Sequence, residues 1–441
     1  MQFFFSSRGR SKSMTSIISR AANKSSGAPA PVKEEGLAAV REPAVPLSGR
    51  DIICFAGEDW WYHNPHSNLH LMKAFAKQNR IIFVNSIGVR APNLRKDKFA
   101  GKRILGKLKS LLRYFKKAEE NIWVLTPLAI PLFKGKEEQI SKINKTLLTC
   151  QVKFAAGLIK FQRPVLWVCV PTVQPAAAEL QKAYARCVVY YCCDNISYLE
   201  GVKNEFVAGL EETLHRSADV AFFANESLAA ERRAVNPNTH YLPHGTDYEH
   251  FERAQGTGLK IPEDMILINR PVVGYMGSLR GLDFELVRYL AERNPGLSFV
   301  FIGDILSDVE PLKAVPNIHF LGKKPYGELP AYLAAMDCLT IFYKRGETFN
   351  DYRNPKKLLE YFATGKPVVA MAIKELEQYK KFMSLAASYE EFEKLMLKAL
   401  AGEDAGTRNE RVRFARNLTW DHAAAGAGAR INQAIGKREA Q

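Results

Sequence analysis

YRNPKKLLEYFATGKPVVA, residues 352–370, is the stretch that decides the fold, because it contains a complete helix followed by the start of a strand. Asn354 is a good N-cap residue, Pro355 suits the first helical position, and Gly365 is a typical helix stop. The following PVVA is typical of a buried strand. The stretch therefore predicts a helix that begins at about Pro355, directly beyond the carboxyl end of the apolar run CLTIFYK.

The chain around this helix alternates in the same way. After Pro271, apolar runs alternate with amphipathic stretches in the order VVGYMGS, FELVRYLAER, LSFVFIGD, NIHFLGK, LPAYLAAMD, CLTIFYK, KKLLEYFATG, PVVAM and EEFEKLMLKAL. Such runs separated by helices are the pattern of parallel strands buried on both faces. Residues 251–400 are therefore predicted to form a doubly wound α/β domain.

A first series of the same kind begins at Asp51, with the apolar runs DIICFAG, RIIFVNS, VLWVCVP, VVYYCCD and VAFFANES. It predicts an N-terminal α/β domain over residues 49–250, joined to the second through a stretch rich in Gly, Thr and Pro. Residues 401–441 have helical period, and we expect them to pack back over the first domain. Because ligands of such folds bind at the carboxyl ends of the strands, two facing domains predict a site in the cleft between them.

Composition indicates a globular protein with an anion-attracting surface. Of 441 residues, 47% are hydrophobic and 24% charged, and the formal net charge is +16. This charge favours nucleotides, nucleic acid, acidic glycans or anionic lipid without choosing among them. The seven cysteines form no CxxC pair, so we expect buried free thiols in a reducing compartment. No apolar run approaches the roughly eighteen residues that span a bilayer, which predicts a cytoplasmic protein.

Residues 1–48 are rich in Ser, Ala, Arg and Lys and carry no acid before Glu34. A segment of this composition buries too little surface to order itself, so we expect a flexible tail. Its acid-poor start also fits an organellar transit peptide, or an extended start with Met14 as the true initiator.

The predicted helix at Pro355 begins with two cations. Lys356 and Lys357 fall in its first turn, where the helix dipole disfavours positive charge by up to about 1 kcal/mol each. Lys356 also precedes Glu360 by four residues, which is the less favourable order for a helix ion pair. A diphosphate at the helix start, with the carboxylate on ribose hydroxyls, would explain both features. The alternative is a solvated helix face with a chance ion pair.

The segment GYMGSLRG, residues 274–281, forms the first strand-to-helix turn of the second domain. Gly277 allows close approach of the backbone to a ligand, Ser278 offers a hydroxyl, and Arg280 can hold phosphate oxygens in a bidentate manner. A glycine turn alone is weak evidence. This turn lies at the same end of the same predicted sheet as the Lys356 helix, which strengthens the evidence for a ligand site there.

These segments together resemble a known family. The order GYMGSLRG, FVFIGD, NIHFLGK, LPAYLAAMD and NPKKLLEYFATGKPVVA resembles the donor domain of group 1, family four-like glycosyltransferases, especially those of bacterial cell-surface polysaccharides. In the first half, YYCCDNISYLEG, RSADVAFFANESLA and YLPHGTDYEHF resemble the acceptor domain and hinge. The resemblance covers about residues 51–400 and implies a GT-B fold, in which two Rossmann-like domains face each other across a cleft.

The resemblance also implies a chemistry. It implies transfer of a sugar from a nucleoside-diphosphate sugar to a glycan or lipid-linked acceptor, usually with retention and without a metal or other cofactor. By this resemblance Glu360 lies on the ribose, while Arg280 and a nearby lysine hold the pyrophosphate. The absence of a DxD motif agrees with metal independence. The predicted donor-binding residues are Gly277, Ser278, Arg280, Asn354, Lys356 and Glu360.

The sequence departs from the family at one position. The first glutamate of the family's paired-glutamate motif would fall at Tyr352, so its contact with the donor sugar is absent or comes from Asp351, Arg353 or Asn354. The identity of the donor sugar therefore stays open, and a GT-B scaffold without catalysis stays an alternative.

The catalytic candidates of the first domain follow its strands. The loop GEDWWYHNPHSNLH places Glu58, Asp59, His63 and His66 among aromatic residues, as acceptor-sugar sites often do. Asp194, at the end of VVYYCCD, is a further candidate. We predict Asp59, His66 and Asp194 as catalytic residues; the alternative is that Asp59 caps the next helix and the histidines lie on the surface.

The segment FAGKRILGKLKSLLRYFKKA, residues 99–118, has apolar residues at helical spacing and seven Lys or Arg on the remaining surface. This pattern is typical of a helix on an anionic membrane surface, and equally of a core-facing helix with a basic outer face. The first of these alternatives predicts that the protein is peripheral on the inner face of the cell membrane.

Three rival functions are less well supported. A nucleotide-sugar epimerase of the same fold would show an Asp-Ser-Gly-Gly run, which is absent. Polyanion or RNA binding is favoured by charge alone, without any RNP-like or KH-like pattern, so no nucleic-acid partner is expected. A P-loop phosphotransferase is disfavoured because GKP, residues 365–367, lacks the Ser/Thr and the upstream glycine loop.

Overall fold

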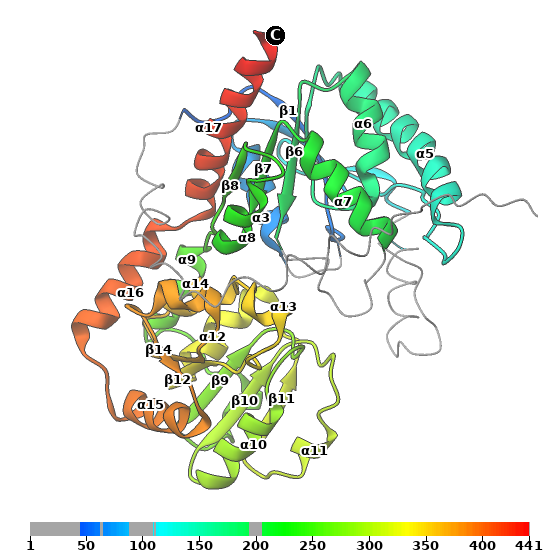
Figure 1. Ribbon diagram of the computed structural model, residues 1–441. Helices are drawn as coiled ribbons and strands as arrows, with labels where there is room; N and C mark the ends of the chain where they lie inside the picture. The colour runs from blue at the N-terminus through cyan, green and yellow to red at the C-terminus, as the bar shows by residue number, and fades with distance from the viewer. Residues whose placement is uncertain (1–44, 62–64, 88–108, 110–111, 194–204, 441) are drawn as a thin grey trace, which may run out of the picture. The chain divides into compact units, whose positions relative to one another are not determined.

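The computed structural model describes residues 45–61, 65–87, 109, 112–193 and 205–440 (Figure 1). These residues contain two sheets, each with its own hydrophobic core. The sequence prediction of a two-domain, doubly wound α/β fold is confirmed. No helix in the described ranges is long and apolar enough to cross a membrane.

The first sheet has eight strands in the order β3-β4-β2-β1-β5-β6-β7-β8, and all neighbouring pairs are parallel except β3 with β4. Its strands are β1 (Asp51–Phe55), β2 (Arg80–Val84), β3 (Phe115–Glu119), β4 (Ile122–Leu125), β5 (Val165–Val168), β6 (Cys187–Cys192), β7 (Val220–Phe223) and β8 (Thr239–Tyr241). Helices α3 (Ser67–Ala76), α5 (Glu137–Leu158), α6 (Gln174–Ala183), α7 (Glu205–Ser217) and α8 (Glu226–Arg232) connect them.

The second sheet has six parallel strands in the order β11-β10-β9-β12-β13-β14, which is the Rossmann order 3-2-1-4-5-6. They are β9 (Val272–Met276), β10 (Ser298–Ile302), β11 (Ile318–Gly322), β12 (Cys338–Ile341), β13 (Val368–Met371) and β14 (Ser384–Ala386). The helices of this domain are α10 (Phe284–Arg293), α11 (Glu310–Lys313), α12 (Leu329–Ala334), α13 (Thr348–Asp351), α14 (Lys357–Ala363) and α15 (Tyr389–Ala401).

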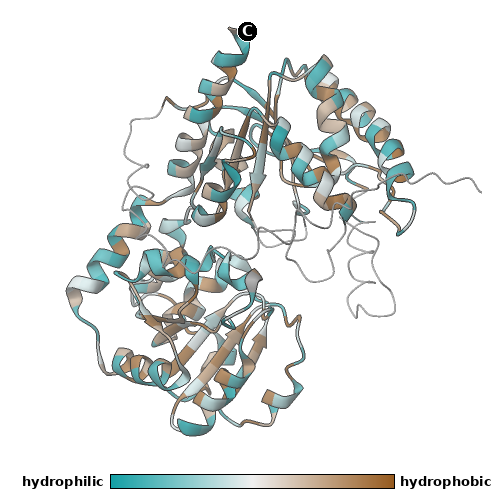
Figure 2. Cartoon of the chain, viewed as in Figure 1, coloured by the Kyte–Doolittle hydropathy of each residue, from teal (hydrophilic) through white to brown (hydrophobic). Residues whose placement is uncertain are grey.

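Continuous apolar runs form the central strands because both faces of each sheet are covered. Every residue of β1, β6, β9 and β10 is buried. Figure 2 shows the strands as largely hydrophobic, whereas the helices carry polar residues on their outer faces. The short helix α9 (Tyr248–Glu252) gives Tyr248 and Phe251 to the second core, so the change from one core to the other falls between Leu242 and Tyr248.

The C-terminal residues form α16 (Ala405–Asn417) and α17 (Trp420–Glu439). Helix α17 contacts α3, and its residues Trp420, Ala427 and Ile431 belong to the first core. The AGAGA run at residues 425–429 lies inside this helix. Addition of a Cβ atom at Gly428 would place it 2.8 Å from the Leu47 nitrogen, so this glycine permits close packing of α17 against the start of the first domain.

Two local predictions were wrong. Helix α14, predicted to begin at about Pro355 directly beyond CLTIFYK, begins at Lys357 with Lys356 rather than Asn354 as its N-cap, and the short helix α13 lies between it and CLTIFYK. A helix was predicted over residues 99–118, but residues 115–118 belong to strand β3. Residues 99–108, 110 and 111 of the same segment lie outside the described residues. In β3 the segment pairs antiparallel with β4, so sheet pairing overrides the helical spacing.

Candidate active site

The turn after β9 is built around Gly277. Its φ of +134° lies in the region that favours glycine, and its N–H donates to the Ile302 carbonyl at 2.7 Å. A Cβ atom at this position would collide with the Lys357 ammonium. The turn is completed by the Tyr275 hydroxyl, which donates to the Ser278 carbonyl at 2.9 Å. The carboxyl end of β9 therefore presents bare backbone beside a lysine.

That lysine, Lys357, is the first residue of α14. Its Nζ donates to the Tyr275 hydroxyl at 2.5 Å and lies 4.0 Å from the centre of the Tyr275 ring. Desolvation, with a smaller contribution from the Arg353 charge, lowers the pKa of Lys357 well below its usual value. An anion at the Gly277 turn would favour the charged form of this lysine.

Lys356 and Glu360 form an ion pair with an N–O distance of 2.8 Å. The Glu360 side chain is only 7% exposed, so the pair is not a solvated surface contact. The Lys356 Nζ also donates to the Pro65 carbonyl of the first domain at 3.1 Å. The pair therefore lies where α14 meets the loop before α3.

Three buried groups of the first domain and the hinge feel the charge of Lys356. Burial raises the pKa of Glu58 to about 7, although Leu69 N–H and Lys356 oppose the shift. Burial together with Lys356 lowers the pKa of His70 to about 2 and that of His244 to about 4. The histidines are therefore neutral at pH 7, beside the Lys356–Glu360 pair.

Two of these groups, Glu58 and His244, also contact the start of α3. The Glu58 carboxylate accepts the N–H of Leu69 at 3.0 Å, so it caps the start of α3. The His244 Nδ1 lies 3.0 Å from the Ser67 hydroxyl at the same helix end. Glu58 is thus tied to the fold as well as to Lys356.

The predicted catalytic residues do not all lie beside the Lys356–Glu360 pair. Asp59 is buried, and its carboxylate accepts the N–H of Trp61 at 3.0 Å, so it stabilises its own loop rather than capping α3. His66 is exposed and occupies the N-cap position of α3 without a side-chain capping bond. Asp194 and His63 lie outside the described residues.

Arg280 follows the Gly277 turn in the sequence, and Arg353 contacts its backbone. The Arg280 side chain is exposed, and no hydrogen bond or ion pair of its guanidinium is found among the described residues. Its carbonyl accepts a bond from Arg353 Nη1 at 3.1 Å, and the Arg353 guanidinium lies 4.2 Å from the Tyr343 ring centre. Arg280 is therefore available to a ligand at the turn, with Arg353 beneath it.

The residues before α14 join the two domains. The Asn354 amide donates to the Ala224 carbonyl at 2.9 Å, which explains why it does not cap α14. The Tyr352 carbonyl accepts from the Asn225 amide at 3.0 Å, and its hydroxyl donates to Glu231 at 3.0 Å. Tyr352, at the position of the family's first glutamate, is thus engaged with the first domain.

Sequence reasoning missed His70 and His244 as members of the site, and it noted Lys357 in the first turn of the helix without placing it under Gly277. His244 lies in the PHG segment at the predicted join between domains, which was the one available signal. His70 has only a place on the apolar face of α3, and that position does not distinguish a core residue from a site residue.

Comparison with known proteins finds similarity to glycosyltransferases in sequence and in fold. Residues 270–401 match the model of the family described as glycosyl transferases group 1. A putative teichuronic acid biosynthesis glycosyltransferase of Bacillus subtilis is 27% identical over 175 residues, which cover 38% of this chain and 40% of that protein. The chain thus matches about two fifths of the length of this curated relative.

Two solved structures share the architecture over almost the whole chain. An α,α-trehalose 6-phosphate synthase from Burkholderia multivorans superposes with a TM-score of 0.60 at 13% identity, covering 89% of this chain and all of that one. The catalytic domain of starch synthase IV from Arabidopsis thaliana, bound to ADP and acarbose, gives a TM-score of 0.59 at 11% identity, covering 88% and 100%. The chain therefore has the GT-B fold, and residues 270–401 of its second domain are similar to the group 1 glycosyl transferases.

Proposed function

We propose that this protein is a glycosyltransferase that moves a sugar from a nucleoside-diphosphate sugar to a glycan or lipid-linked acceptor in surface polysaccharide synthesis. The observation that carries the proposal is the convergence of the Gly277 turn, Lys357 and the buried Lys356–Glu360 pair at the carboxyl end of β9 and the start of α14. The family match over residues 270–401 and the name of the B. subtilis relative support the same function.

The proposed chemistry needs a stabilised leaving group. Cleavage of the sugar–phosphate bond leaves negative charge on the diphosphate, and cations fixed in a partly buried site stabilise such charge strongly. Arg280, Lys356 and Lys357 are the candidates for this role. Because α14 has only seven residues, we assign the stabilisation to these side chains rather than to the helix dipole.

We assign the other predicted residues as follows. Glu360 accepts hydrogen bonds from the ribose hydroxyls once the nucleotide separates it from Lys356, and Gly277 and Ser278 lie along the diphosphate. Asn354 holds the donor domain against the first domain through Ala224. Asp59, His66 and Asp194 remain proposals for the acceptor side. Glu58 accepts the N–H of Leu69 and thereby positions the start of α3.

The direct test is turnover. The protein is incubated with radiolabelled UDP-, GDP- and ADP-sugars, and both transfer to membrane glycan extract and slow donor hydrolysis are measured. We expect one donor to be consumed, and Glu360→Gln to reduce consumption by at least about tenfold, or 1.4 kcal/mol. Glu328→Gln, an exposed glutamate of the same domain, is the matched control. Nucleotide binding without any donor consumption would instead identify a non-catalytic scaffold.

We further propose that transfer proceeds with retention and without a metal ion. The support is the family resemblance and the three cations around the proposed diphosphate. Turnover should survive EDTA, and the anomeric configuration of the product should match that of the donor by NMR. Loss of turnover on chelation that Mn²⁺ or Mg²⁺ restores would overturn the metal-independent mechanism.

We also propose peripheral binding to anionic membrane through the basic segment that precedes and includes β3. In its described part, Lys109, Arg113 and Lys116 are exposed and Leu112 is 88% exposed. Each basic residue near an anionic surface contributes about 1 kcal/mol, screened by salt. Flotation with phosphatidylglycerol vesicles should exceed flotation with neutral vesicles and fall in Leu112→Ser. Equal flotation with both would exclude the proposal without affecting the transferase assignment.

A further inference from the structure

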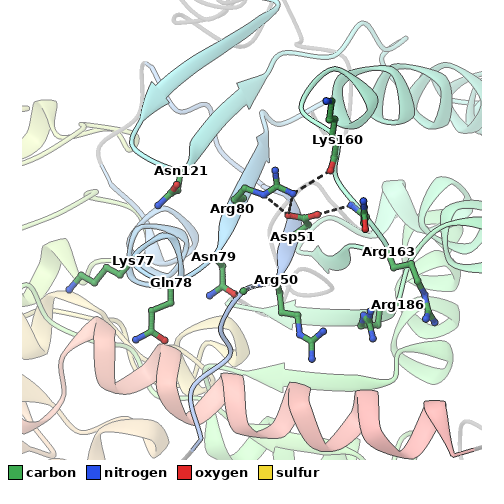
Figure 3. A pocket seen from close by; sticks show the side chains of 12 residues that line it. Arg50, Asp51, Lys77, Gln78, Asn79, Arg80, Asn121, Lys160, Arg163 and Arg186 are labelled. Carbon is green, nitrogen blue, oxygen red and sulfur yellow. Dashed lines mark hydrogen bonds and ion pairs between the residues drawn. The ribbon is translucent and has the colours of Figure 1, made fainter.

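A second basic site lies at the edge of the first sheet where the parallel strands begin. It is an open cavity of about 670 Å³. Figure 3 shows its lining, which includes six cationic side chains and one carboxylate: Arg50, Lys77, Arg80, Lys160, Arg163, Arg186 and Asp51. Glu58 and its loop follow the carboxyl end of β1, so this basic groove lies at the opposite end of the strands from the candidate active site.

Each of four neighbouring strands has an arginine at its first residue or one or two residues before it. Arg80 is the first residue of β2, Arg50 and Arg186 immediately precede β1 and β6, and Arg163 lies two residues before β5. These strands are adjacent in the order β2-β1-β5-β6. Because neighbouring strands lie about 4.8 Å apart, the four arginines begin along a row of about 14 Å.

Only part of this positive charge is neutralised by the protein. Arg80 pairs with Asp51 at 2.7 Å, Lys77 pairs with Asp421 at 2.6 Å, and Arg186 pairs with Glu439. For Arg50, Lys160 and Arg163, by contrast, the described part of the chain provides no carboxylate partner. The buried Arg50 Nε has no hydrogen-bond partner there either. The groove therefore keeps three cations for an external anion.

The groove is long. Lys77 and Arg186 are held by Asp421 and Glu439, which lie near opposite ends of α17. Eighteen residues of helix separate those two carboxylates, which corresponds to about 27 Å at 1.5 Å per residue. Figure 3 shows α17 running along the groove from the side of Lys77 toward Arg186. A single phosphate or one sugar ring would contact only part of the row of four arginines, which extends over about 14 Å.

We propose that this basic groove binds an oligoanionic sugar chain, a glycan that carries a carboxylate or phosphate on successive units. Guanidinium groups bind both kinds of anion in a bidentate manner, and their row matches a ligand with repeated charges. The exposed amides of Gln78 and Gln162 can bond sugar hydroxyls between the charges. The site holds the glycan away from the donor site, and it does not depend on the proposed transferase function.

The test uses the full chain and three probes of defined chemistry. Affinities are measured by calorimetry for oligogalacturonate, for inorganic tripolyphosphate and for a neutral maltooligosaccharide of the same length as the uronate. A phosphorylated oligosaccharide distinguishes the two sources of charge. We expect both charged oligosaccharides to bind, with affinity falling as salt rises. Tripolyphosphate should bind more weakly because it fills less of the groove, and the neutral chain should not bind.

The triple variant Arg50→Gln/Lys160→Gln/Arg163→Gln should weaken oligogalacturonate binding by at least about tenfold. Its affinity for nucleotide should not change, because the donor site lies in the other domain. A control variant, Lys153→Gln/Lys394→Gln/Lys398→Gln, removes the same net charge from exposed lysines for which no ion pair is found among the described residues. Its binding should remain as in the wild type.

Three results would overturn the inference. Equal loss in the control variant would show that net charge alone attracts the glycan. Unchanged binding in the triple variant would place the glycan elsewhere. Tripolyphosphate binding as tight as that of the oligosaccharides would indicate a small-anion site rather than a groove for a sugar chain.

Discussion

Lys356 connects the second domain to the loop before α3. It forms the ion pair with Glu360 and donates to the Pro65 carbonyl. Lys357, next along the chain, lies instead under Gly277 against Tyr275. The two adjacent lysines thus serve different surfaces: one faces the first domain, and the other supports the glycine turn that we propose for the diphosphate.

Substitution of Gly277 tests the proposed role of the glycine turn in nucleotide binding. We expect Gly277→Ala to destabilise the protein by about 1–3 kcal/mol, because φ is +134° and the new methyl would meet the Lys357 ammonium. It should also abolish nucleotide binding. Gly296→Ala is the matched control, since a Cβ atom there has nothing within 4 Å, and it should change stability by less than about 1 kcal/mol.

Both changes are measured by urea denaturation and by nucleotide titration. Equal stability of the two variants, with normal nucleotide affinity in Gly277→Ala, would remove the glycine turn from the proposed site.

Individual residues also show why sequence prediction was incomplete. Gly365 and the strand after it were predicted, because a positive φ and a β-branched run are local properties. The role of Asn354 was not, because its bond to Ala224 depends on a residue 130 positions away. His70 and His244 come together with Lys356 only through packing between elements, which periodicity does not encode.

At the scale of elements, strand β3 and helix α14 mark the limits of pattern analysis. Over residues 115–118, a helix and an edge strand would expose similar side chains, so the sequence pattern does not distinguish the two. Pairing with β4 makes this segment a strand. Helix α14 was predicted in the correct place because its stop and the following strand were both strong signals, whereas its first residue moved by two positions. Element type was therefore predicted better than element boundaries.

Helix α17 provides a prediction at this scale. Gly426 and Gly428 lie two positions apart in one helix, but only Gly428 faces the Leu47 backbone, at 2.8 Å from an added Cβ atom. Gly426→Ala should stabilise the protein by about 0.5–1 kcal/mol, the usual gain of alanine over glycine in a helix. Gly428→Ala should destabilise it, because α17 must move away from the first core. Thermal unfolding of the two variants measures this difference, and a stabilised Gly428→Ala would contradict the packing of α17 on Leu47.

For the whole molecule, buried titratable groups set the dependence of stability on pH. Burial lowers the pKa of His70 to about 2 and that of His215 and His244 to about 4. Their contribution is present above pH 6.5 and is lost as the pH falls, because the unfolded histidines then take up protons first. Burial raises the pKa of Glu58 and Glu375 to about 7, so their contribution is present below pH 4.5 and is lost as the pH rises toward 7.

Burial lowers the pKa of His240 to about 4 as well, so between pH 6.5 and 4.5 four histidines outnumber the two glutamates, and we expect the unfolding temperature to fall on acidification. His215→Gln should reduce this fall, since the glutamine can keep the bond to the Thr239 hydroxyl without a proton to gain. Scanning calorimetry from pH 7.5 to 4.5 measures both proteins. An unfolding temperature that rises on acidification would show that the glutamates dominate.

We propose that the second domain binds a nucleoside diphosphate through the Gly277 turn, Arg280 and Glu360. Calorimetric titration of the wild-type protein, Glu360→Ala and Arg280→Ala with UDP, GDP and ADP tests it most directly, with unfolding temperatures recorded to confirm that each variant is folded. We predict that one of the three nucleotides binds the wild type and that each substitution weakens it by at least about tenfold. Unchanged affinity in both folded variants, or no binding of any nucleotide to the wild type, would contradict the assignment.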